Sequence, residues 1–522
     1  MINQLNQLLF LLGSFWLLSI LWFFRTTRAM LFWIYLWQLK DYHWGRFLDH
    51  FRTDKGKKLF LAPLPILKIV LVIYAYFLSL TDMTIWQLYA IWITVLSILY
   101  LLESYKFIRE VFSRTLKTPI LTIKTIALVI AMFIVQSVFL YVSFQNQQSY
   151  MYWFAFYLLL FDIFLPLTTA LIIFFVHFFT VIFFRNRIIR LAKQKRSKFK
   201  DLLVIGITGS YGKTSTKEFL YKILLSKFKV LTTKENKNSE AGISQTILQD
   251  LTKEHQVFIA EMGAYNRGGI KLLCDIIKPK IGIITGVNEQ HLTTFGSMEN
   301  LLSAEGGKEL IESLPEDGVI FLNEKNRYCR EIYQKIKIRK YLYGKEAKLF
   351  SEENILGAMA VAKELGMTGS EIESVCQSMK DDIPGMATKQ GVNGITIIDS
   401  TYSANPDGVI AHLDYIKTLR RDQGKLIIVM PCLIELGKAS KEVHKRIGEK
   451  IGEVCDLAII TSRERFKDIK EGAEKSASNC KVLYAANKKE ILSTVKPYLD
   501  KGNIVLLEGR LEQPIINLLL KN

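Results

Sequence analysis

The sequence is poor in cysteine, and this low content limits which covalent or metal cross-links can stabilise the protein. Six cysteines occur in 522 residues, at positions 274, 329, 376, 432, 455 and 480. All of them follow the first half of the chain, and none has the spacing of a metal-ligand set. This usage fits a reducing compartment and argues against a disulfide framework or a structural zinc site.

Acidic residues are also scarce relative to basic ones. There are 49 Asp and Glu against 68 Lys and Arg, a formal net charge of +19. Such an excess can indicate a nucleic acid partner, but the sequence lacks basic residues interleaved with stacking aromatics. The basic residues gather in blocks beside apolar segments instead. We therefore expect the anionic surface of a lipid bilayer as the partner, and no nucleic acid.

Charge is nearly absent from five long stretches that approach or exceed the length of a membrane span. These stretches are residues 5–24, 64–80, 85–102, 120–144 and 150–184. Lys and Arg concentrate in residues 25–58, 103–118 and 185–200, and are absent from the N-terminal tip, 81–84 and 145–149. The positive-inside rule then predicts a multi-pass protein of the cell (inner) membrane, with five crossings, an outside N-terminus and a cytoplasmic C-terminal part.

The fifth stretch is too long for a single crossing, since a helix through residues 150–184 would reach about 52 Å against a hydrocarbon core of about 30 Å. Pro166 is a candidate break, and Asp162 lies just before it. Asp162 is expected either to face a lipid headgroup or to cap a helix at the interface. Lys68 and Lys124 are expected to extend toward the interface. Residues 29–52 read as an amphipathic segment on the inner surface.

After the basic stretch, strand and helix patterns alternate to the C-terminus, as in βαβ units with parallel sheets. A segment rich in Pro, Gly and polar residues, 381–394, separates two domains. The predicted fold class is multi-domain. An α-helical transmembrane domain (1–184) and a basic juxtamembrane linker (185–200) precede an α/β phosphate-loop domain (201–384) and a smaller Rossmann-like α/β domain (385–522).

A glycine-rich motif, GITGSYGKTSTKE, opens the first α/β domain at residues 206–218. Its T-G-x-x-G-K-T spacing departs from the usual phosphate loop, because position 207 is Ile where that loop has glycine. Backbone amides of such a turn, backed by a helix N-terminus, bind phosphate. Lys213 is expected to reach the β- and γ-phosphates, and Thr214 to bind Mg²⁺. The predicted nucleotide-binding residues here are Thr208, Gly209, Ser210, Tyr211, Gly212, Lys213, Thr214 and Ser215.

Three further residues follow strand patterns or begin a helix. Glu261 ends an apolar strand and is placed to bind Mg²⁺ directly or through water. His291 follows another strand, although a lone histidine is more often packed or exposed. Asn405 precedes Pro406, and this pair can be explained as a helix cap alone.

Six ordered motifs over residues 200–522 resemble the Mur ligase family, and within it the branch that adds D-alanyl-D-alanine to a muramoyl peptide. They are TGSYGKTSTKE, NKNSEAGIS, EMGAYNRGGI, NEQHLTTFGS, DSTYSANPDG and IELGKASKEVHKRIG. The resemblance implies ATP-driven amide bond formation through an acyl phosphate, with ATP and Mg²⁺ as cofactors. It implies that Lys213, Glu261 and His291 act in catalysis, and that Thr214, Glu261 and His291 hold the metal. Asn405 would bind adenosine, and Asn236 and Asn238 would place the muramoyl substrate.

The sequence also departs from the family in ways that carry information. A membrane domain takes the place of the UDP-binding domain. Where relatives often carry a carbamylated lysine, alignment places Glu305, or alternatively Gly307 beside Lys308, so Glu305 is a candidate substrate-site carboxylate. The usual Pro-Gly-Arg of the linker is Pro-Gly-Met at 384–386, which leaves Lys389 as a possible nucleotide-binding substitute.

These observations favour a membrane-anchored ligase of peptidoglycan precursor synthesis. Its expected partners are the bilayer, a muramoyl peptide or lipid-linked precursor, and an amino acid or dipeptide amine. A polyglutamate-synthase-like or amidating ligase is the alternative within enzymes. A non-catalytic ATP-binding scaffold of the wall machinery, or a transporter component, is the alternative outside that class.

Overall fold

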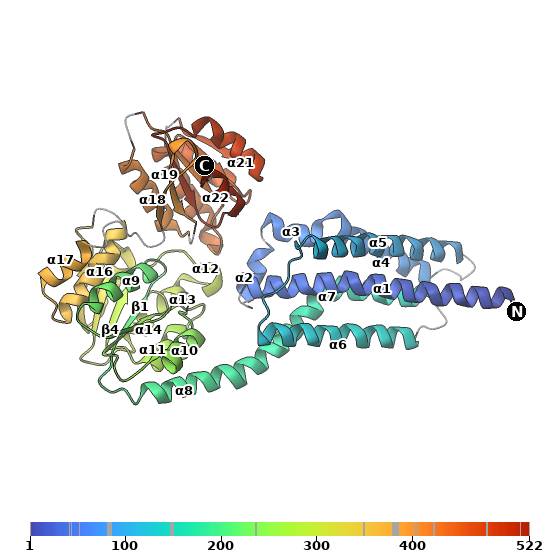
Figure 1. Cartoon of the computed structure of the whole chain (residues 1–522), viewed down its shortest axis with the longest axis horizontal. Helices are drawn as coiled ribbons and strands as arrows, with labels where there is room; N and C mark the ends of the chain where they lie inside the picture. Colours follow the sequence, from blue (N-terminus) through green and yellow to red (C-terminus); the bar gives the residue numbers. More distant parts are fainter. Residues whose placement is uncertain are drawn as a thin grey trace. The chain divides into compact units, whose positions relative to one another are not determined.

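The computed structural model forms two compact units, residues 1–185 and residues 186–522, which are described separately below (Figure 1). It describes residues 2–520 except 41, 43, 52, 81–85, 147–150, 235–236, 348–349, 378–385, 402–403, 421–422, 477–478 and 512.

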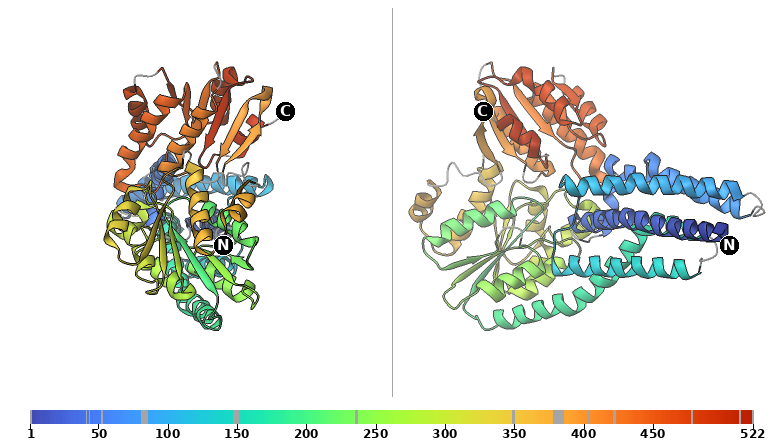
Figure 2. Two further views of the ribbon diagram at one scale, coloured as in Figure 1. Left: turned by 90° about the vertical axis from the view of Figure 1, so that its left-hand side faces the viewer. Right: turned by 45° about the vertical axis from the view of Figure 1, so that its right-hand side comes forward.

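The first unit contains helices and connecting segments but no strand among its described residues. Its helices are α1 (Ile2–Leu39), α2 (Trp44–His50), α3 (Asp54–Leu61), α4 (Pro63–Ser79), α5 (Trp86–Phe112), α6 (Ile123–Asn146) and α7 (Met151–Thr180), followed by the short π-helix η1 (Val181–Arg185). The long helices lie side by side (Figures 1 and 2). Five helical stretches among the described residues have the length and apolar character needed to cross a membrane. Many of their outward side chains are large and apolar, such as Ile73, Phe77 and Ile134.

Two expectations about this unit are wrong. Residues 29–39 do not form a separate surface segment, because α1 continues through them and buries Met30, Ile34 and Trp37. Pro166 does not break the fifth helix, since α7 runs from Met151 to Thr180 with the proline inside it. Proline is tolerated within membrane helices when neighbouring groups compensate for the hydrogen bond it removes.

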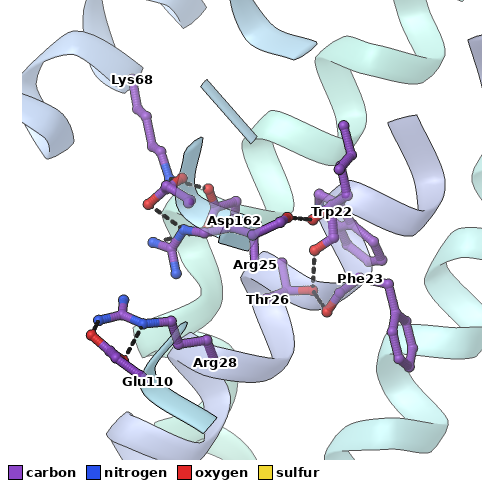
Figure 3. Close-up of polar contacts among 11 residues, drawn as sticks. Trp22, Phe23, Arg25, Thr26, Arg28, Lys68, Glu110 and Asp162 are labelled. Atoms are coloured by element: carbon purple, nitrogen blue, oxygen red, sulfur yellow. Dashed lines mark hydrogen bonds and ion pairs between the residues drawn. The ribbon is translucent and has the colours of Figure 1, made fainter. Parts of the chain in front are cut away.

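Four charged side chains meet inside the first unit, and we call them the buried quartet: Arg25, Lys68, Glu103 and Asp162 (Figure 3). The Lys68 Nζ lies 2.6 Å from Glu103 Oε2 and 2.5 Å from Asp162 Oδ2. The Arg25 Nε lies 2.6 Å from Glu103 Oε1, and its Nη2 lies 3.4 Å from Asp162 Oδ1. Asp162 therefore faces two cations rather than a headgroup or a helix end, and Lys68 is buried rather than extended to the interface.

The second unit begins with the helix α8 (Asn186–Arg196), which covers most of the expected linker. This helix packs on α10 and α11 and buries Ile189 and Ala192 in the domain core. The Arg196 guanidinium donates to the carbonyls of Ile277 and Phe199 at 2.8 and 2.7 Å. The basic segment is thus an integral helix of the α/β unit, fixed at its C-terminal end.

Two six-stranded sheets form the rest of the second unit. The first sheet has the order β2-β3-β1-β4-β5-β6 and is parallel throughout. Its strands are β1 (Leu203–Thr208), β2 (Val230–Thr232), β3 (Val257–Glu261), β4 (Ile281–Ile284), β5 (Val319–Asn323) and β6 (Arg339–Tyr343). The sheet is covered on both faces by helices, as its continuous apolar strands require. Those helices include α9 (Lys213–Leu225), α10 (Glu240–Asp250), α11 (Gly269–Ile277), α12 (Leu292–Phe295), α13 (Met298–Ser303), α14 (Lys308–Ile311), α15 (Arg327–Lys335), α16 (Phe350–Glu364) and α17 (Gly369–Gln377).

The second sheet has the order β11-β10-β9-β12-β8-β7, with only β7 antiparallel among the described strands. Its strands are β7 (Ala387–Gln390), β8 (Thr396–Ser400), β9 (Leu426–Met430), β10 (Leu457–Ile460), β11 (Lys481–Tyr484) and β12 (Ile504–Glu508). Its helices are α18 (Pro406–Thr418), α19 (Ser440–Val454), α20 (Phe466–Lys475), α21 (Lys488–Val495) and α22 (Gln513–Leu520), with short η2 (Val392–Gly394), η3 (Gly437–Ala439) and η4 (Lys496–Tyr498). In such sheets ligands bind beyond the carboxyl ends of the strands.

Candidate active site

The phosphate loop lies between the end of β1 and the start of α9, as the sequence predicts. Gly209 and Gly212 have φ of +142° and +75°, values that favour glycine. A Cβ on Gly209 would lie 2.2 Å from Thr285 Oγ1, and one on Gly212 would lie 2.4 Å from Asn354 Oδ1. The Lys213 ammonium folds back and donates to the Gly209 carbonyl. The loop is thus a tight backbone cradle that side chains would fill.

A first carboxylate, Glu261, stands beside this loop at the end of β3 and is buried. Its Oε1 accepts hydrogen bonds from Thr214 Oγ1 and Asn238 Nδ2, each at 3.1 Å. Its Oε2 lies 3.4 Å from the Nζ of Lys217, a lysine that is fully buried in α9. Oxygen ligands gathered in this way suit Mg²⁺.

A second carboxylate, Glu305, lies on the other side of the loop and is 1% exposed. It accepts a hydrogen bond from Ser210 Oγ at 2.9 Å, and its Oε1 lies 3.1 Å from His291 Nδ1 and 4.0 Å from Lys213 Nζ. Burial raises the pKa of this carboxyl, but His291 and Lys213 outweigh burial and hold the pKa below its ordinary value. Glu305 is therefore a carboxylate at neutral pH.

A cavity of about 360 Å³ opens next to the loop, between the two sheet domains of the second unit. It is lined by Tyr211, Val287, Asn288, Glu289, Lys325, Asn326, Arg327, Tyr328, Glu353, Asp407 and Arg446. The Asn288 amide donates to Asn405 Oδ1 at 3.1 Å and to Asp407 Oδ2 at 2.9 Å, which joins the two domains across the cavity. Burial raises the pKa of the Asp407 carboxyl. A mixed polar cavity of this size suits a nucleoside.

A loop of the second sheet domain also reaches the phosphate site. It follows β9, and the backbone carbonyl of Glu435 accepts a hydrogen bond from Thr293 N at 3.0 Å. The Glu435 Oε2 lies 3.9 Å from His291 Nε2. His291 thus stands between Glu305 of one domain and Glu435 of the other.

Two protein-family models match the part of the chain that forms this site. Residues 207–382 match the family model of the Mur ligase middle domain, and residues 386–511 match that of the Mur ligase glutamate ligase domain. The chain carries the middle and C-terminal domains of a Mur ligase.

The similar proteins are ligases of muramoyl peptides. The UDP-N-acetylmuramoyl-tripeptide–D-alanyl-D-alanine ligase of Bacillus subtilis (strain 168) is 26% identical over 59% of this chain and 72% of its own length. The enzyme of the same name from Synechocystis sp. is 32% identical over 48% of this chain and 59% of its own length. The solved structure of MurF ligase from Thermotoga maritima in complex with ADP is similar in fold, with a TM-score of 0.53 and 24% identity over 64% of this chain and 83% of that one.

Mur ligases use ATP and Mg²⁺ to form C–N bonds. The residues present here fit both groups. The glycine cradle and the helix N-terminus of α9 suit phosphates, and the buried Oγ1 of Thr208 has no hydrogen-bond partner among the described residues. Thr214 and Glu261 supply oxygen donors for a divalent cation, and His291 and Glu305 supply a second pair.

The structure brings together most of the residues predicted from the sequence. Those around the Mur ligase phosphate loop are Thr208, Gly209, Ser210, Tyr211, Gly212, Lys213, Thr214, Ser215, Asn238, Glu261, His291 and Glu305. Asn405 caps α18, because its Oδ1 accepts a hydrogen bond from Gly408 N at 3.0 Å. The same oxygen accepts from the Asn288 amide beside the cavity, so Asn405 is both a helix cap and a neighbour of the cavity. Lys389 lies elsewhere, in β7, with its Nζ 2.6 Å from Asp399. Asn236 lies outside the described residues.

Sequence reasoning missed four residues of the site: Lys217, Asn288, Asp407 and Glu435. Lys217 follows Lys213 by one helical turn and therefore points the same way along α9, a signal that periodicity could have given. Asn288 and Asp407 lie inside the motifs NEQHLTTFGS and DSTYSANPDG, three residues before His291 and two after Asn405. Glu435 lies inside the motif IELGKASKEVHKRIG, but only the approach of the two domains brings it to His291.

Proposed function

We propose that this protein is a membrane-anchored, ATP-dependent ligase that adds an amino acid or a dipeptide such as D-alanyl-D-alanine to the muramoyl peptide of a lipid-linked cell-wall precursor. The observation that carries the ligase assignment is the phosphate cradle flanked by Glu261 and Glu305 beside an interdomain cavity. The relatives named for this reaction share that part of the chain.

The residues divide the chemistry between them. Lys213 and the loop amides hold the β- and γ-phosphates of ATP, and the cavity with Asn288 and Asp407 holds its nucleoside. Thr214, Glu261 and His291 would hold Mg²⁺, which neutralises phosphate charge when bound. The γ-phosphoryl group passes to a substrate carboxylate, giving ADP and an acyl phosphate. The amine nitrogen then forms a bond to the acyl carbon as the bond to phosphate breaks, so phosphate leaves with the electron pair. Of the two protons that the ammonium nitrogen loses, one ends on the released phosphate and the other in solvent.

Glu305 has a defined place in this scheme. It is a permanent carboxylate 4.0 Å from the Lys213 ammonium and 3.1 Å from His291. Positioning and charge neutralisation supply most of the rate in phosphoryl transfer, and a fixed acid that orients both a lysine and a histidine contributes to each. Asn238, through its bond to Glu261, and Asn236 are proposed to place the muramoyl substrate.

The membrane part of the proposal rests on the apolar helices of the first unit and on the basic helix that follows them. We place the N-terminus outside and the ligase domains in the cytoplasm, where ATP is present. A helical membrane unit in place of a nucleotide-sugar domain favours a substrate presented at the inner leaflet. The exposed Arg187 and Arg190 of α8 suit an anionic surface.

The test uses purified full-length protein in lipid nanodiscs with ATP, Mg²⁺ and D-alanyl-D-alanine. One reaction receives the UDP-linked muramoyl tripeptide and the other its lipid-linked form. We expect ADP release and a product of increased mass with the lipid-linked form. Equal or faster reaction of the soluble form would contradict the lipid assignment, and no ATP turnover with either form would contradict the ligase assignment.

A further inference from the structure

Glu435 belongs to the C-terminal sheet domain, and the structure places its carboxylate beside His291 of the central domain. The residue follows β9, at the carboxyl edge of the second sheet. Its φ is +67°, a left-handed conformation that is unfavourable for a non-glycine residue and that clusters at functional sites. We propose that the Glu435 carboxylate binds the positively charged amino group of the incoming amine. This inference rests on the ligase function proposed above.

The loop that carries Glu435 is held firmly against the central domain. Its own backbone carbonyl accepts from Thr293 N at 3.0 Å, and the next residue, Leu436, is buried. At Gly437 an added Cβ would lie 3.3 Å from Thr293 Oγ1, so the loop sits close to α12 at this point. The Glu435 side chain is 11% exposed. Its direction is therefore set by the fit of two domains and not by a freely moving loop.

The Glu435 carboxylate lies on one side of His291, and the phosphate loop lies on the other. The imidazole of His291 separates two acids, with Nδ1 3.1 Å from Glu305 and Nε2 3.9 Å from Glu435. Glu305 faces Lys213, which holds phosphate in the proposed reaction. Glu435 thus lies on the side of His291 away from the phosphate loop. A group bound to it would approach the acyl phosphate from the C-terminal domain.

The negative charge of Glu435 indicates which reactant its carboxylate binds. A carboxylate near the triphosphate repels it, so Glu435 does not serve the nucleotide. The residues proposed to hold Mg²⁺ all come from the central domain: Thr214 and Glu261 lie against the phosphate loop, and His291 lies between Glu305 of that site and Glu435. The remaining reactant is an amine, which is a cation before it reacts, and a carboxylate is the natural partner of an ammonium group.

Three contacts between the domains do not involve the Glu435 side chain. The bond from Thr293 uses the Glu435 backbone, and Asn288 and Asp407 form a separate contact at 2.9 Å. Glu289 and Arg446 form another, with Oε2 and Nη2 3.2 Å apart. Glu435→Gln therefore leaves all three contacts between the domains in place while it removes the negative charge.

The test separates acyl phosphate formation from use of the amine. Full-length protein receives ATP, Mg²⁺ and lipid-linked muramoyl tripeptide, with either hydroxylamine or an amine. Hydroxylamine is largely uncharged at pH 7.5, and it traps acyl phosphates as hydroxamates without needing an ammonium site. The amines are D-alanyl-D-alanine, D-alanine, glycine and L-lysine, and KM is measured for the one with the highest turnover. Variants are Glu435→Gln, Glu435→Asp and the control Glu442→Gln, an exposed residue in the first turn of α19.

We expect Glu435→Gln to form hydroxamate within about twofold of the wild-type rate and to raise the KM for the amine at least about tenfold, because a hydrogen bond to a charged group is lost. Glu435→Asp is expected to recover part of the affinity, and Glu442→Gln to match the wild type. A parallel loss of hydroxamate formation in Glu435→Gln, an unchanged KM, or wild-type protein that forms hydroxamate but uses no amine would each overturn the inference. Wild-type protein that forms no hydroxamate would instead overturn the ligase function itself.

Discussion

Two groups of charged side chains in this protein differ in how closely the charges within each group pair with one another. In the buried quartet, two cations face two carboxylates at 2.5–3.4 Å, and its formal charges sum to zero. At the phosphate loop, Lys213 donates to a carbonyl of its own loop, and a buried hydroxyl of Thr208 has no partner among the described residues. The quartet is electrically neutral by itself, although Arg25 Nε and Asp162 Oδ1 make no hydrogen bond among the described residues, whereas the phosphate site leaves donors beside a cavity for a ligand.

The difference indicates different roles. A self-neutralised group inside apolar helices fixes which helices pack together, because each member is costly to bury without the others. A group with open donors beside a cavity is suited to binding and to chemistry. We therefore expect substitutions in the phosphate site to change turnover far more than stability, and substitutions in the quartet to change stability far more than turnover.

The largest effect is expected from Lys213→Ala. Loss of the ammonium that neutralises the transferred phosphate should lower amine-dependent ATP turnover by at least about 10³-fold. The melting temperature should stay within a few degrees of wild type, because the lysine contacts only its own loop and, at 4.0 Å, Glu305. ADP release and thermal unfolding measure the two quantities. Lys222→Ala, exposed on the same helix, serves as the control, and similar turnover in both variants would contradict the assignment.

Asp162→Asn is expected to lower the stability of the protein and leave turnover per folded molecule nearly unchanged. This change leaves Lys68 and Arg25 facing one carboxylate in a buried site, and breaking such a group costs about 3 kcal/mol of unfolding free energy. Hydroxamate formation per folded molecule should stay near wild type. The double variant Asp162→Leu with Lys68→Met removes one charge of each sign and should recover much of the loss. Thermal unfolding in detergent micelles measures the change, and a stable variant with low turnover would reverse the comparison.

The sequence predicted much of the fold and of the phosphate site, for reasons visible in particular residues. Nine apolar runs of the sequence predict strands, and each contains one, because buried parallel strands need continuous apolar residues. The runs are residues 202–207, 257–260, 281–285, 319–322, 395–398, 426–430, 457–461, 481–484 and 504–507. The strands β2, β6 and β7 are not predicted, since they are short or, as in Arg339–Tyr343, begin with charged residues at a sheet edge. The loop, Glu261 and His291 were found because motif spacing places them at strand ends.

Other features depend on long-range packing that no local pattern records. Lys68 and Asp162 lie 94 positions apart, and each looked like an isolated charge near a span end. Their pairing requires α4 and α7 to be neighbours. Asn288 and Asp407 meet only when two separately folded domains approach. α7 likewise continues through Pro166, which the helix-breaking tendency of proline does not predict.

A third effect, smaller than the first two, concerns the charge of Glu305. Glu305→Gln should lower turnover by about 10²-fold, since the carboxylate orients both Lys213 and His291. Burial opposes ionisation, but His291 and Lys213 keep the pKa of Glu305 below its ordinary value. The carboxylate thus contributes stability above the pKa of the unfolded chain, about 4.3, and loses it as pH falls through the lower folded pKa.

The measurement for Glu305 is the stability of wild type minus that of Glu305→Gln across pH. We expect a constant difference from pH 8 to about pH 5 and a decreasing one below that. A difference that already changes between pH 8 and 6 would contradict a lowered pKa.

The fourth prediction concerns binding of the nucleotide, with little effect on binding of the amine. Asn288→Ala removes the amide that donates to Asn405 and Asp407 in the wall of the cavity. We expect the KM for ATP to rise about tenfold, which is the value of one to two hydrogen bonds, with little change in the KM for the amine. Steady-state kinetics with each substrate varied in turn measure this. An equal rise in both constants would mean that Asn288 serves domain closure and not the nucleoside.

The smallest effect is expected at Lys389, which the sequence suggested as a substitute for a phosphate-binding arginine. Its Nζ pairs with Asp399 at 2.6 Å in the second sheet domain, and its side chain is 41% exposed. An ion pair this exposed is worth at most about 1 kcal/mol. Lys389→Ala should therefore change the KM for ATP less than about twofold, and stability only slightly. A loss comparable to that of Lys213→Ala would show that Lys389 leaves Asp399 for the phosphates during turnover, and that open donors for the nucleotide extend beyond the loop.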